Sequence, residues 1–491
     1  MALKLIYKDI ALGAAEDAAV TATNAESFST LSELPYGVST GAVATLEHNG
    51  WGLSHDYKVK SAQPFAFWSQ RVSGDDCVFE TPPAIVIEFD AQYTSTGLTF
   101  RFSPGANEWC SEMRVLWYQN GVIKESGTYY PTLPLFTLEN TVEAFDMIGI
   151  IFDKTSLPNR RVKLEYVGIG IIREFDAQEL TGAKIIHEID LVSETVPINV
   201  IDADFHSKTD TEYIFQKKQP VEVYDAENLI GVYYIEKGIR TGARHYNISC
   251  QDAIGTLDLD EYPGAFWWEL TPLADILTDI LGGSFALDIS AEAAAKMLKG
   301  HIPKCKKREA LQQAAFAAGV CIDTTGSKKI KVFIPQTGEG AEIPAKETYT
   351  GGKVETSDVV TAVSVTAWSF RDERPYEGED YIEFNKVQYR CASVEYIAEN
   401  PNVTAGTLPN KISYENCYLI STVNAQERAN ALLAHHMKRN KYTAAHVLRD
   451  QQPGGRYKIS LPWGDEANAN IRKMTVTMSG INASETEFIL D

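Results

Sequence analysis

The stretch HYNISCQDAIGTLDLDEYPG, residues 245–264, decides how the chain divides into modules. It contains four acidic residues, Asp252, Asp258, Asp260 and Glu261. Successive side chains of a β-strand point to opposite faces, so a strand over residues 245–250 separates His245 from Cys250. The two cannot act as a local pair, and we expect Cys250 to be a small buried residue. We interpret the stretch as the last strand of a barrel and its exit toward a helix beginning near residue 271.

The acidic end of this stretch has a structural explanation. Asp258 and Asp260 alternate with Leu257 and Leu259, which predicts outward carboxylates and inward leucines. A calcium loop needs a D-x-D-x-D-G spacing, and these residues do not supply it. We therefore predict no metal site here.

The remaining chemical candidates also favour a structural role. His435 and His436 are adjacent, and neighbouring helix residues diverge by about 100°, so one ion cannot be chelated from one face. The sequence has no G-x-x-x-x-G-K-[ST], G-x-S-x-G or dinucleotide fingerprint. We predict no catalytic residues, no metal and no cofactor, and therefore no enzyme. A glycosidase-type carboxylate pair stays open, because 66 acidic residues make chance pairs plentiful.

The composition limits the classes of protein to which the chain can belong. The 491 residues are enough for about three or four domains. The net charge of −21 disfavours tight binding to nucleic acid or to anionic membranes. Seven scattered cysteines without a C-x-x-C pair indicate reduced thiols. A secretory signal is not apparent, and no stretch approaches the ~18 apolar residues of a transmembrane helix, so we expect folding in the cytosol.

The N-terminal third reads as an extended arm, residues 1–32, followed by a β-sandwich, residues 33–172. The sandwich contains short β-branched and aromatic runs separated by turn residues at spacings of about 8–12. Three segments, "FWSQRVSGDDCVFETPPAIVIEFDAQYTSTGLTFRFSP", "MRVLWYQNGVI" and "DMIGIIFDKTSLPNRRVKLEYVGIG", resemble the discoidin or galactose-binding-like jelly roll.

Aromatic residues are concentrated in this sandwich. We predict that Phe67, Trp68 and Trp117 belong to its core. Exposed rings at a jelly-roll rim suit stacking on sugars. The candidates for such a rim site are Trp109, Tyr129 and Tyr130; Trp51 and Phe65 belong to the same aromatic group.

Downstream, the pattern predicts three further modules. Residues 173–262 are strand-rich and form a first small barrel, and residues 263–350 form a helical α+β domain. Residues 351–491 form a second barrel with one long helix. In the helical domain, "TPLADILTDILGG" places Thr271 as N-cap and glycines at the end, and "KREALQQAAFAAGV" is a second helix ending at Gly319. The expected fold class is mainly β with α+β inserts.

The order of these parts resembles a family of bacteriophage tail hub or tail-associated baseplate proteins. The segments "YNISCQDAIGTLDLDEYPGAFW", "PLADILTDILGG" and "GHIPKCKKREALQQAAFAAGVCIDTTGSKKIKVF" carry the resemblance, over about residues 175–370. It implies a trimeric ring in which paired small barrels form a collar between the tail tube and the tip or tape-measure components. No lytic domain follows the barrels, and the N-terminal sandwich is an addition to the larger hubs.

Two functions follow from the sequence. The first is a structural tail-tip or baseplate hub in a phage or phage-tail-like particle. It is a homotrimer that contacts a tail tube or distal tail protein and a tape-measure or spike protein, and lines a channel for DNA or tape measure. The alternative is a carbohydrate-binding or carbohydrate-active tail protein that recognises a host-surface glycan through the sandwich. Both place the protein in the virion tail, assembled in the bacterial cytoplasm.

Overall fold

The computed structural model describes residues 3–38, 47, 66–102, 108–208, 213, 215–226, 228–404, 406–477 and 483–491. Strands account for 52% of the structure and helices for 12%. The predicted fold class, mainly β with α+β inserts, is therefore confirmed. The chain divides into two compact units, which are described separately. Trp51 and Phe65 lie outside the described residues.

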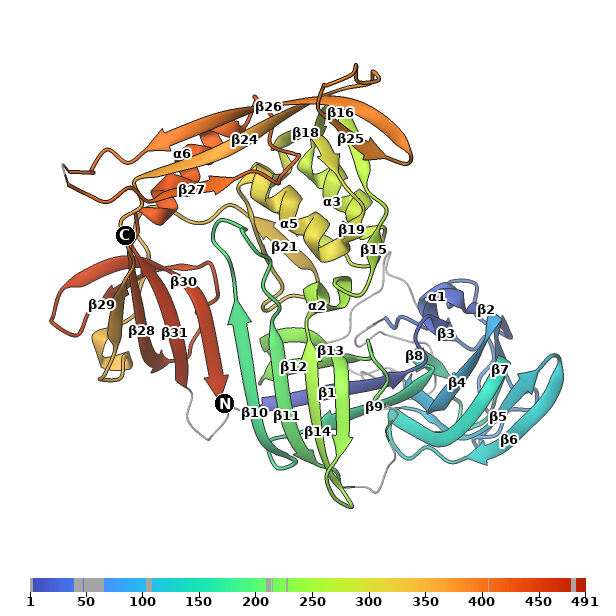
Figure 1. Cartoon of the computed structure of the whole chain (residues 1–491). Coiled ribbons are helices and arrows are strands. Elements are labelled where there is room, and N and C mark those ends of the chain that lie inside the picture. The colour runs from blue at the N-terminus through green and yellow to red at the C-terminus, as the bar shows by residue number, and fades with distance from the viewer. Residues whose placement is uncertain are drawn as a thin grey trace. The chain divides into compact units, whose positions relative to one another are not determined.

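The first unit, residues 6–174 and 211–220, is built on one antiparallel sheet in the order β3-β8-β4-β7-β5-β6, with β2 on β4 (Figure 1). The strands of this sheet are β2 (Ala19–Thr23), β3 (Phe67–Trp68), β4 (Ala84–Phe102), β5 (Cys110–Gln119), β6 (Val122–Tyr129), β7 (Leu135–Thr155) and β8 (Lys163–Gly168). Two further strands, β1 (Leu3–Ile10) and β9 (Gly170–Phe175), pair with one another outside it. The short helices α1 (Ala14–Asp17) and η1 (Leu31–Glu33) precede β3. Two of the strands predicted separately, 84–91 and 97–104, form the single long strand β4, whose pairing with β7 shifts register between them.

The core of this unit is aromatic, as the sequence predicts. Phe67, Trp68 and Trp117 are at most 7% exposed. Trp117 packs edge-on against Tyr129, and Phe67 stacks on Phe152 from β7. Large rings of this kind provide most of the apolar area that a sandwich buries. The three predicted core residues are confirmed.

The second unit contains a long curved sheet formed from both ends of its sequence. The strand order is β23-β28-β31-β30-β10-β11-β14-β13-β12, with β29 on β30 and β22 on β29 (Figure 1). Its strands are β10 (Leu180–Glu188), β11 (Val200–His206), β12 (Pro220–Asp225), β13 (Asn228–Arg240), β14 (His245–Gln251), β22 (Ala341–Glu342), β23 (Lys353–Thr356), β28 (Asn440–Val447), β29 (Arg456–Ser460), β30 (Glu466–Thr477) and β31 (Ala483–Leu490). The two predicted barrels thus share one sheet, joined where β10 pairs with β30 over Lys184–Glu188.

An α+β module separates the two halves of this sheet along the chain. Its first part holds α2 (Ala253–Leu257), β15 (Glu261–Tyr262), β16 (Ala265–Pro272), α3 (Leu273–Leu281), β17 (Leu287–Ile289), α4 (Ala291–Ala294), β18 (Met297–Ile302), β19 (Cys305–Lys306), α5 (Lys307–Ala318), β20 (Cys321–Asp323) and β21 (Ile330–Phe333). After η3 (Ala345–Glu347), its second part holds the sheet of β24 (Ala362–Arg371), β25 (Tyr381–Phe384), β26 (Val387–Glu399) and β27 (Lys411–Tyr414), and α6 (Ala425–His436). All of these helices and the β24 sheet contribute to one apolar core. Residues 362–436, which the predicted division assigns to the second barrel, therefore pack with α3 and α5.

The sequence predicts the C-terminal ends of α3 and α5 correctly and the N-cap of α3 wrongly. Gly282 and Gly319 adopt the left-handed conformation after α3 and α5, as predicted. Thr271 is not the N-cap of α3: Pro272 occupies that position and no side chain caps the helix. The Thr271 hydroxyl donates to the carbonyl of Glu269 instead, because Thr271 is still part of strand β16.

A buried cation holds the helices of this module together. Arg428 on α6 is 4% exposed, and its guanidinium lies over the ring of Phe316 on α5, 4.6 Å from the ring centroid. The guanidinium also donates to the carbonyl of Val192, in the segment that follows β10. A buried guanidinium is retained only where such contacts replace its hydration. Arg428 therefore links α6, α5 and the strand segment that leads to β11.

Replacing Arg428 should destabilise this unit. Arg428→Ala leaves the Val192 carbonyl unpaired and opens a void against Phe316, so we expect a loss of about 3 kcal/mol in the free energy of unfolding. Arg428→Met fills most of that void and should lose less. Urea denaturation followed by tryptophan fluorescence measures both variants. The control is Arg449→Ala, whose side chain is 62% exposed in an ion pair with Glu347 and should shift the midpoint little. Equal midpoints for Arg428→Ala and the control would contradict this role.

Candidate functional site

The stretch 245–264 is a packed junction in the structure. Along β14 the side chains alternate, with His245 exposed and Cys250 2% exposed, so the predicted separation is confirmed. Burial raises the pKa of the Cys250 thiol above its ordinary value, which keeps it protonated and unreactive. Leu257 is fully buried, but Leu259 is 49% exposed, so its inward orientation was wrongly predicted. The reason is local: residues 253–257 form helix α2 rather than a continued strand, and the period of two no longer applies.

Asp252 connects this strand to the helical module through a fully buried network. Its carboxylate accepts from the Gly255 amide at 3.1 Å, which caps α2, and from the Thr324 hydroxyl at 2.6 Å. The Asn199 side-chain amide nitrogen donates to the same hydroxyl at 3.0 Å, and its side-chain oxygen Oδ1 accepts from the Glu188 backbone amide on β10. Burial raises the pKa of Asp252 to about 6, although these hydrogen bonds oppose the shift. The local sequence shows the aspartate and the helix that it caps, but not Asn199 and Thr324, which lie 53 and 72 residues away along the chain.

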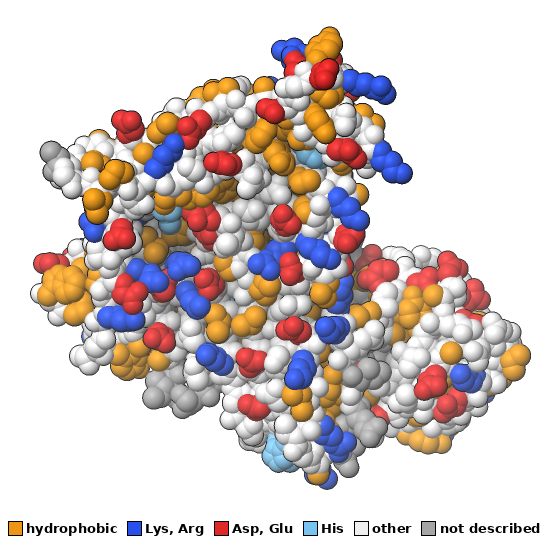
Figure 2. All heavy atoms as spheres, in the orientation of Figure 1, with side chains coloured by type: hydrophobic (Ala, Val, Ile, Leu, Met, Phe, Trp, Pro, Cys, Tyr) orange, Lys and Arg blue, Asp and Glu red, His pale blue; other side chains and the backbone are white. Residues whose placement is uncertain are grey.

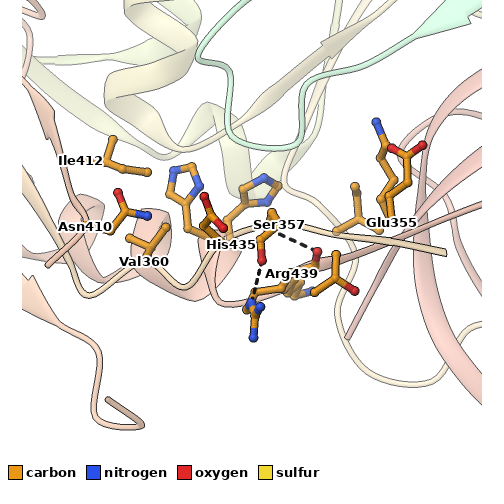
Figure 3. A pocket seen from close by; sticks show the side chains of 13 residues that line it. Glu355, Ser357, Val360, Asn410, Ile412, His435 and Arg439 are labelled. Atoms are coloured by element: carbon orange, nitrogen blue, oxygen red, sulfur yellow. Dashed lines mark hydrogen bonds between the residues drawn. The ribbon is translucent and has the colours of Figure 1, made fainter. Parts of the chain in front are cut away.

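One hollow of the second unit lies beside the C-terminal end of α6. It has a volume of about 490 Å³, and its walls come from residues 355–360, β27 and the segment after α6 (Figure 3). Ser357 and Arg439 are joined by three hydrogen bonds: the Ser357 hydroxyl and backbone amide both donate to the Arg439 carbonyl, and the guanidinium donates to the Ser357 carbonyl. The Ser357 hydroxyl is thus engaged with backbone, and no described lining residue pairs it with a base.

The two helical histidines border this hollow with different partners. Burial lowers the pKa of His435 to about 4, so its ring is neutral at pH 7. His436 lies 2.8 Å from the Tyr414 hydroxyl and 3.2 Å from a carboxylate oxygen of Glu194. The hydrogen bond with His436 lowers the pKa of the Glu194 carboxyl. These contacts attach the helix end to neighbouring segments.

A second cavity, of about 460 Å³, lies against the joint between β10 and β30. Ile185, Met474 and Val476 form its apolar wall, and residues 448–452 contribute polar side chains. His187 also lines it, with its Nε2 atom 2.5 Å from the Tyr233 hydroxyl. Burial lowers the pKa of His187 to about 4. Its side chain is therefore neutral and acts as a hydrogen-bonding member of the sheet interior.

The predicted rim residues lie at the same end of the first unit's sheet. The Trp109 indole donates to the Pro131 carbonyl at 3.0 Å, which places it beside the end of β6. Tyr129 is half-buried and packs on the core, whereas Tyr130 is 64% exposed. Within this predicted aromatic cluster, Trp109 and Tyr129 both pack on the core of the unit, and Tyr130 offers the most open ring. A sugar ligand for it stays a prediction.

The described residues contain neither a cluster of metal ligands nor a helix that could span a membrane. Within them, no group of three or more histidine, cysteine, aspartate or glutamate side chains has the geometry to hold a metal ion. No helix of the described chain combines the length and the apolar character needed to cross a bilayer.

Comparison with known proteins gives structural neighbours but no family. No protein-family model matches the sequence, and no curated protein matches it. Similar solved structures include a tail protein from Neisseria meningitidis MC58, with a TM-score of 0.47 and 15% identity over 65% of this chain and 93% of that one. The 43 kDa tail protein of prophage MuSo2 from Shewanella oneidensis has a TM-score of 0.44 and 9% identity, over 65% and 95% of the two chains. Prophage tail protein gp18 from Listeria monocytogenes EGD-e has a TM-score of 0.42 and 12% identity, over 64% and 90%.

The junction at Asp252 predicts a specific pH dependence. Its pKa is raised from 3.8 in the unfolded chain to about 6, so the folded state holds a proton that the unfolded state releases. The contribution of this proton to the free energy of unfolding is fully present below pH 3.8 and is lost as the pH rises through about 6. The free energy of unfolding falls by about 3 kcal/mol over this range. Asp252→Asn keeps a capping side chain but cannot ionise, so it should gain stability relative to the native protein between pH 4 and pH 7.

Urea midpoints of both proteins across this range measure the difference. Other groups that titrate there, His187 and His435 among them, are common to both proteins and cancel. Asp258→Asn is the control, because that carboxylate is 48% exposed in a surface ion pair. A stability difference that stays constant from pH 4 to pH 7 would show that Asp252 does not titrate as described.

Proposed function

We propose that this chain is a structural hub component of the tail tip or baseplate of a phage or phage-tail-like particle. The observation that carries the proposal is the single curved sheet, in which β10–β14 form one half and β28–β31, with the short edge strands β22 and β23, form the other, and the two halves pair through β10 and β30. Each half corresponds to one of the paired barrels that the sequence resemblance implies. The α+β module lies between them in the expected order, with α3, α5 and the β20–β21 hairpin in sequence.

In this proposal three copies form a ring, each contributing two arcs of sheet to a collar. The collar joins the tail tube or a distal tail protein to tape-measure or spike components and surrounds the channel through which DNA or tape measure passes. A net charge of −21 suits a wall past which DNA must slide without adhering. On the face shown in Figure 2, acidic and basic side chains are interspersed, without a broad basic surface. The role is structural rather than catalytic, and its place is the virion tail.

A second candidate function rests on the aromatic cluster of the first unit. The exposed ring of Tyr130 beside the anchored indole of Trp109 suits stacking on the apolar face of a sugar. The chain would then contribute to recognition of a host-surface glycan. This function is compatible with a place in the tail, because tails meet the cell surface.

Location in the particle tests the hub proposal. Particles purified after induction of the bacterium that carries the gene are labelled with gold-conjugated antibody against this chain. We expect gold only at the distal end of the tail, and crosslinking of particles should yield a species three times the mass of one chain. Labelling along the tube, labelling on the head, or particles without the chain would each contradict a hub at the tip.

Binding to immobilised glycans tests the second function. We expect Tyr130→Ala to lose at least about tenfold in affinity for any glycan that the native protein binds, because stacking on the ring is removed. Tyr376→Ala removes a ring that is 73% exposed in the other unit and should change nothing. No binding by the native protein, or equal loss in both variants, would exclude the aromatic cluster as a sugar site.

A further inference from the structure

The solvent-facing side of the β11–β14 ladder carries a row of polar pairs. The pairs that face one another are Asp202 with Ser249, Asp204 with Asn247, and His206 with His245. The Ser207 amide donates to the Arg244 carbonyl at 2.9 Å, so residues 207 and 244 form a hydrogen-bonded pair. The three polar pairs therefore occupy the alternate positions of the ladder, where opposing side chains approach most closely.

The histidine pair differs from its two neighbours. The Ser249 hydroxyl donates to Asp202 at 2.6 Å, and the Asn247 amide donates to Asp204 at 2.8 Å. The rings of His206 and His245 have centroids 4.6 Å apart at an interplanar angle of 44°. In the described part of the chain, the Nδ1 atom of His206 is shielded from solvent and has no hydrogen-bond partner. A buried polar atom without a partner is costly and calls for a ligand, such as an ion, that satisfies it.

We propose that His206 and His245 chelate a divalent transition-metal ion, Zn²⁺ by preference, across the two strands. Imidazole nitrogens are preferred ligands of Zn²⁺, and strand pairing fixes the two rings side by side before the ion arrives. Two imidazoles fill two of the four positions of a tetrahedral zinc site, and water molecules would fill the other two. The carboxylate of Asp204, two residues from His206 on the same face, adds favourable negative charge nearby.

The bound ion bridges the ends of β11 and β14. The histidine pair lies at the same end of both strands, since His206 is the last residue of β11 and His245 is the first residue of β14. Histidine side chains reach the surface in this part of the sheet (Figure 2). A metal bridge therefore resists fraying of the ladder and stabilises the folded state in proportion to the occupancy of the site.

Calorimetric titration of ZnCl₂ into the untagged protein tests this site. A polyhistidine tag is avoided because it binds the same ions, and a thiol reductant that does not chelate zinc keeps the cysteines reduced. We expect a site of one ion per chain that His245→Ala weakens by about tenfold or more, with a similar loss for His206→Ala. Asn247→Ala, on the same strand and face, should bind Zn²⁺ as the native protein does. Mg²⁺ should give no heat at the same concentrations.

Two further readouts keep the result unambiguous. His245 is exposed, so His245→Ala is expected to fold, and its circular dichroism spectrum verifies this. Zinc should raise the melting temperature of the native protein, and the increase should be absent from the double variant His206→Ala/His245→Ala. Equal zinc binding by the double variant and the native protein, or no binding by the native protein, overturns the proposal. Either result leaves the proposed hub function unaffected, because the ring does not depend on this ion.

Discussion

The pairing of β10 with β30 is the constraint on which the second unit depends. Lys184–Glu188 is matched with residues 473–477, almost three hundred positions later in the sequence. On the inner face Ile185 lies opposite Val476, and both are buried. On the outer face Glu188 forms ion pairs with Arg472 and Lys473. Without this contact the two halves of the sheet would each expose a hydrogen-bonding edge, and the α+β module would connect two unpaired pieces.

Closing so long a loop is entropically costly, and the inserted module reduces that cost by being folded itself. Helices α6 and α5 pack together in its core. Arg428 on α6 contacts Phe316 on α5 and donates a hydrogen bond to Val192, in the segment between β10 and β11. The chain then leaves the module through residues 437–440 and enters β28, a strand of the same sheet. The β10–β30 pairing and the α+β module thus stabilise one another, and a substitution that destabilises one should also destabilise the other.

The sequence predicts local structure well and long-range pairing poorly. The helices that end at Gly282 and Gly319 were predictable because amphipathic spacing and a C-terminal glycine are local signals. The exposed Leu259 and the uncapped start of α3 were missed, since a tertiary preference for helix α2 and strand β16 overrode the local pattern. The β10–β30 joint had no local signal at all, because both strands show the same apolar alternation as their neighbours. Sequence therefore suggested two barrels where the structure has one sheet.

The same limit explains which chemical groups could be foreseen. The opposite orientation of His245 and Cys250 follows from strand periodicity alone, so the sequence excluded that pair correctly. The partner that does face His245 is His206, thirty-nine residues earlier, and only the register of β11 with β14 reveals it. Asp252 is a similar case, because its pKa is raised by burial in the folded chain, and the hydrogen bonds from Thr324 and Asn199 that oppose this shift come from segments the local sequence does not show. In a β-rich chain, strand register rather than residue type decides which side chains are in contact. A site formed by such cross-strand contacts can therefore be identified only after the register is known.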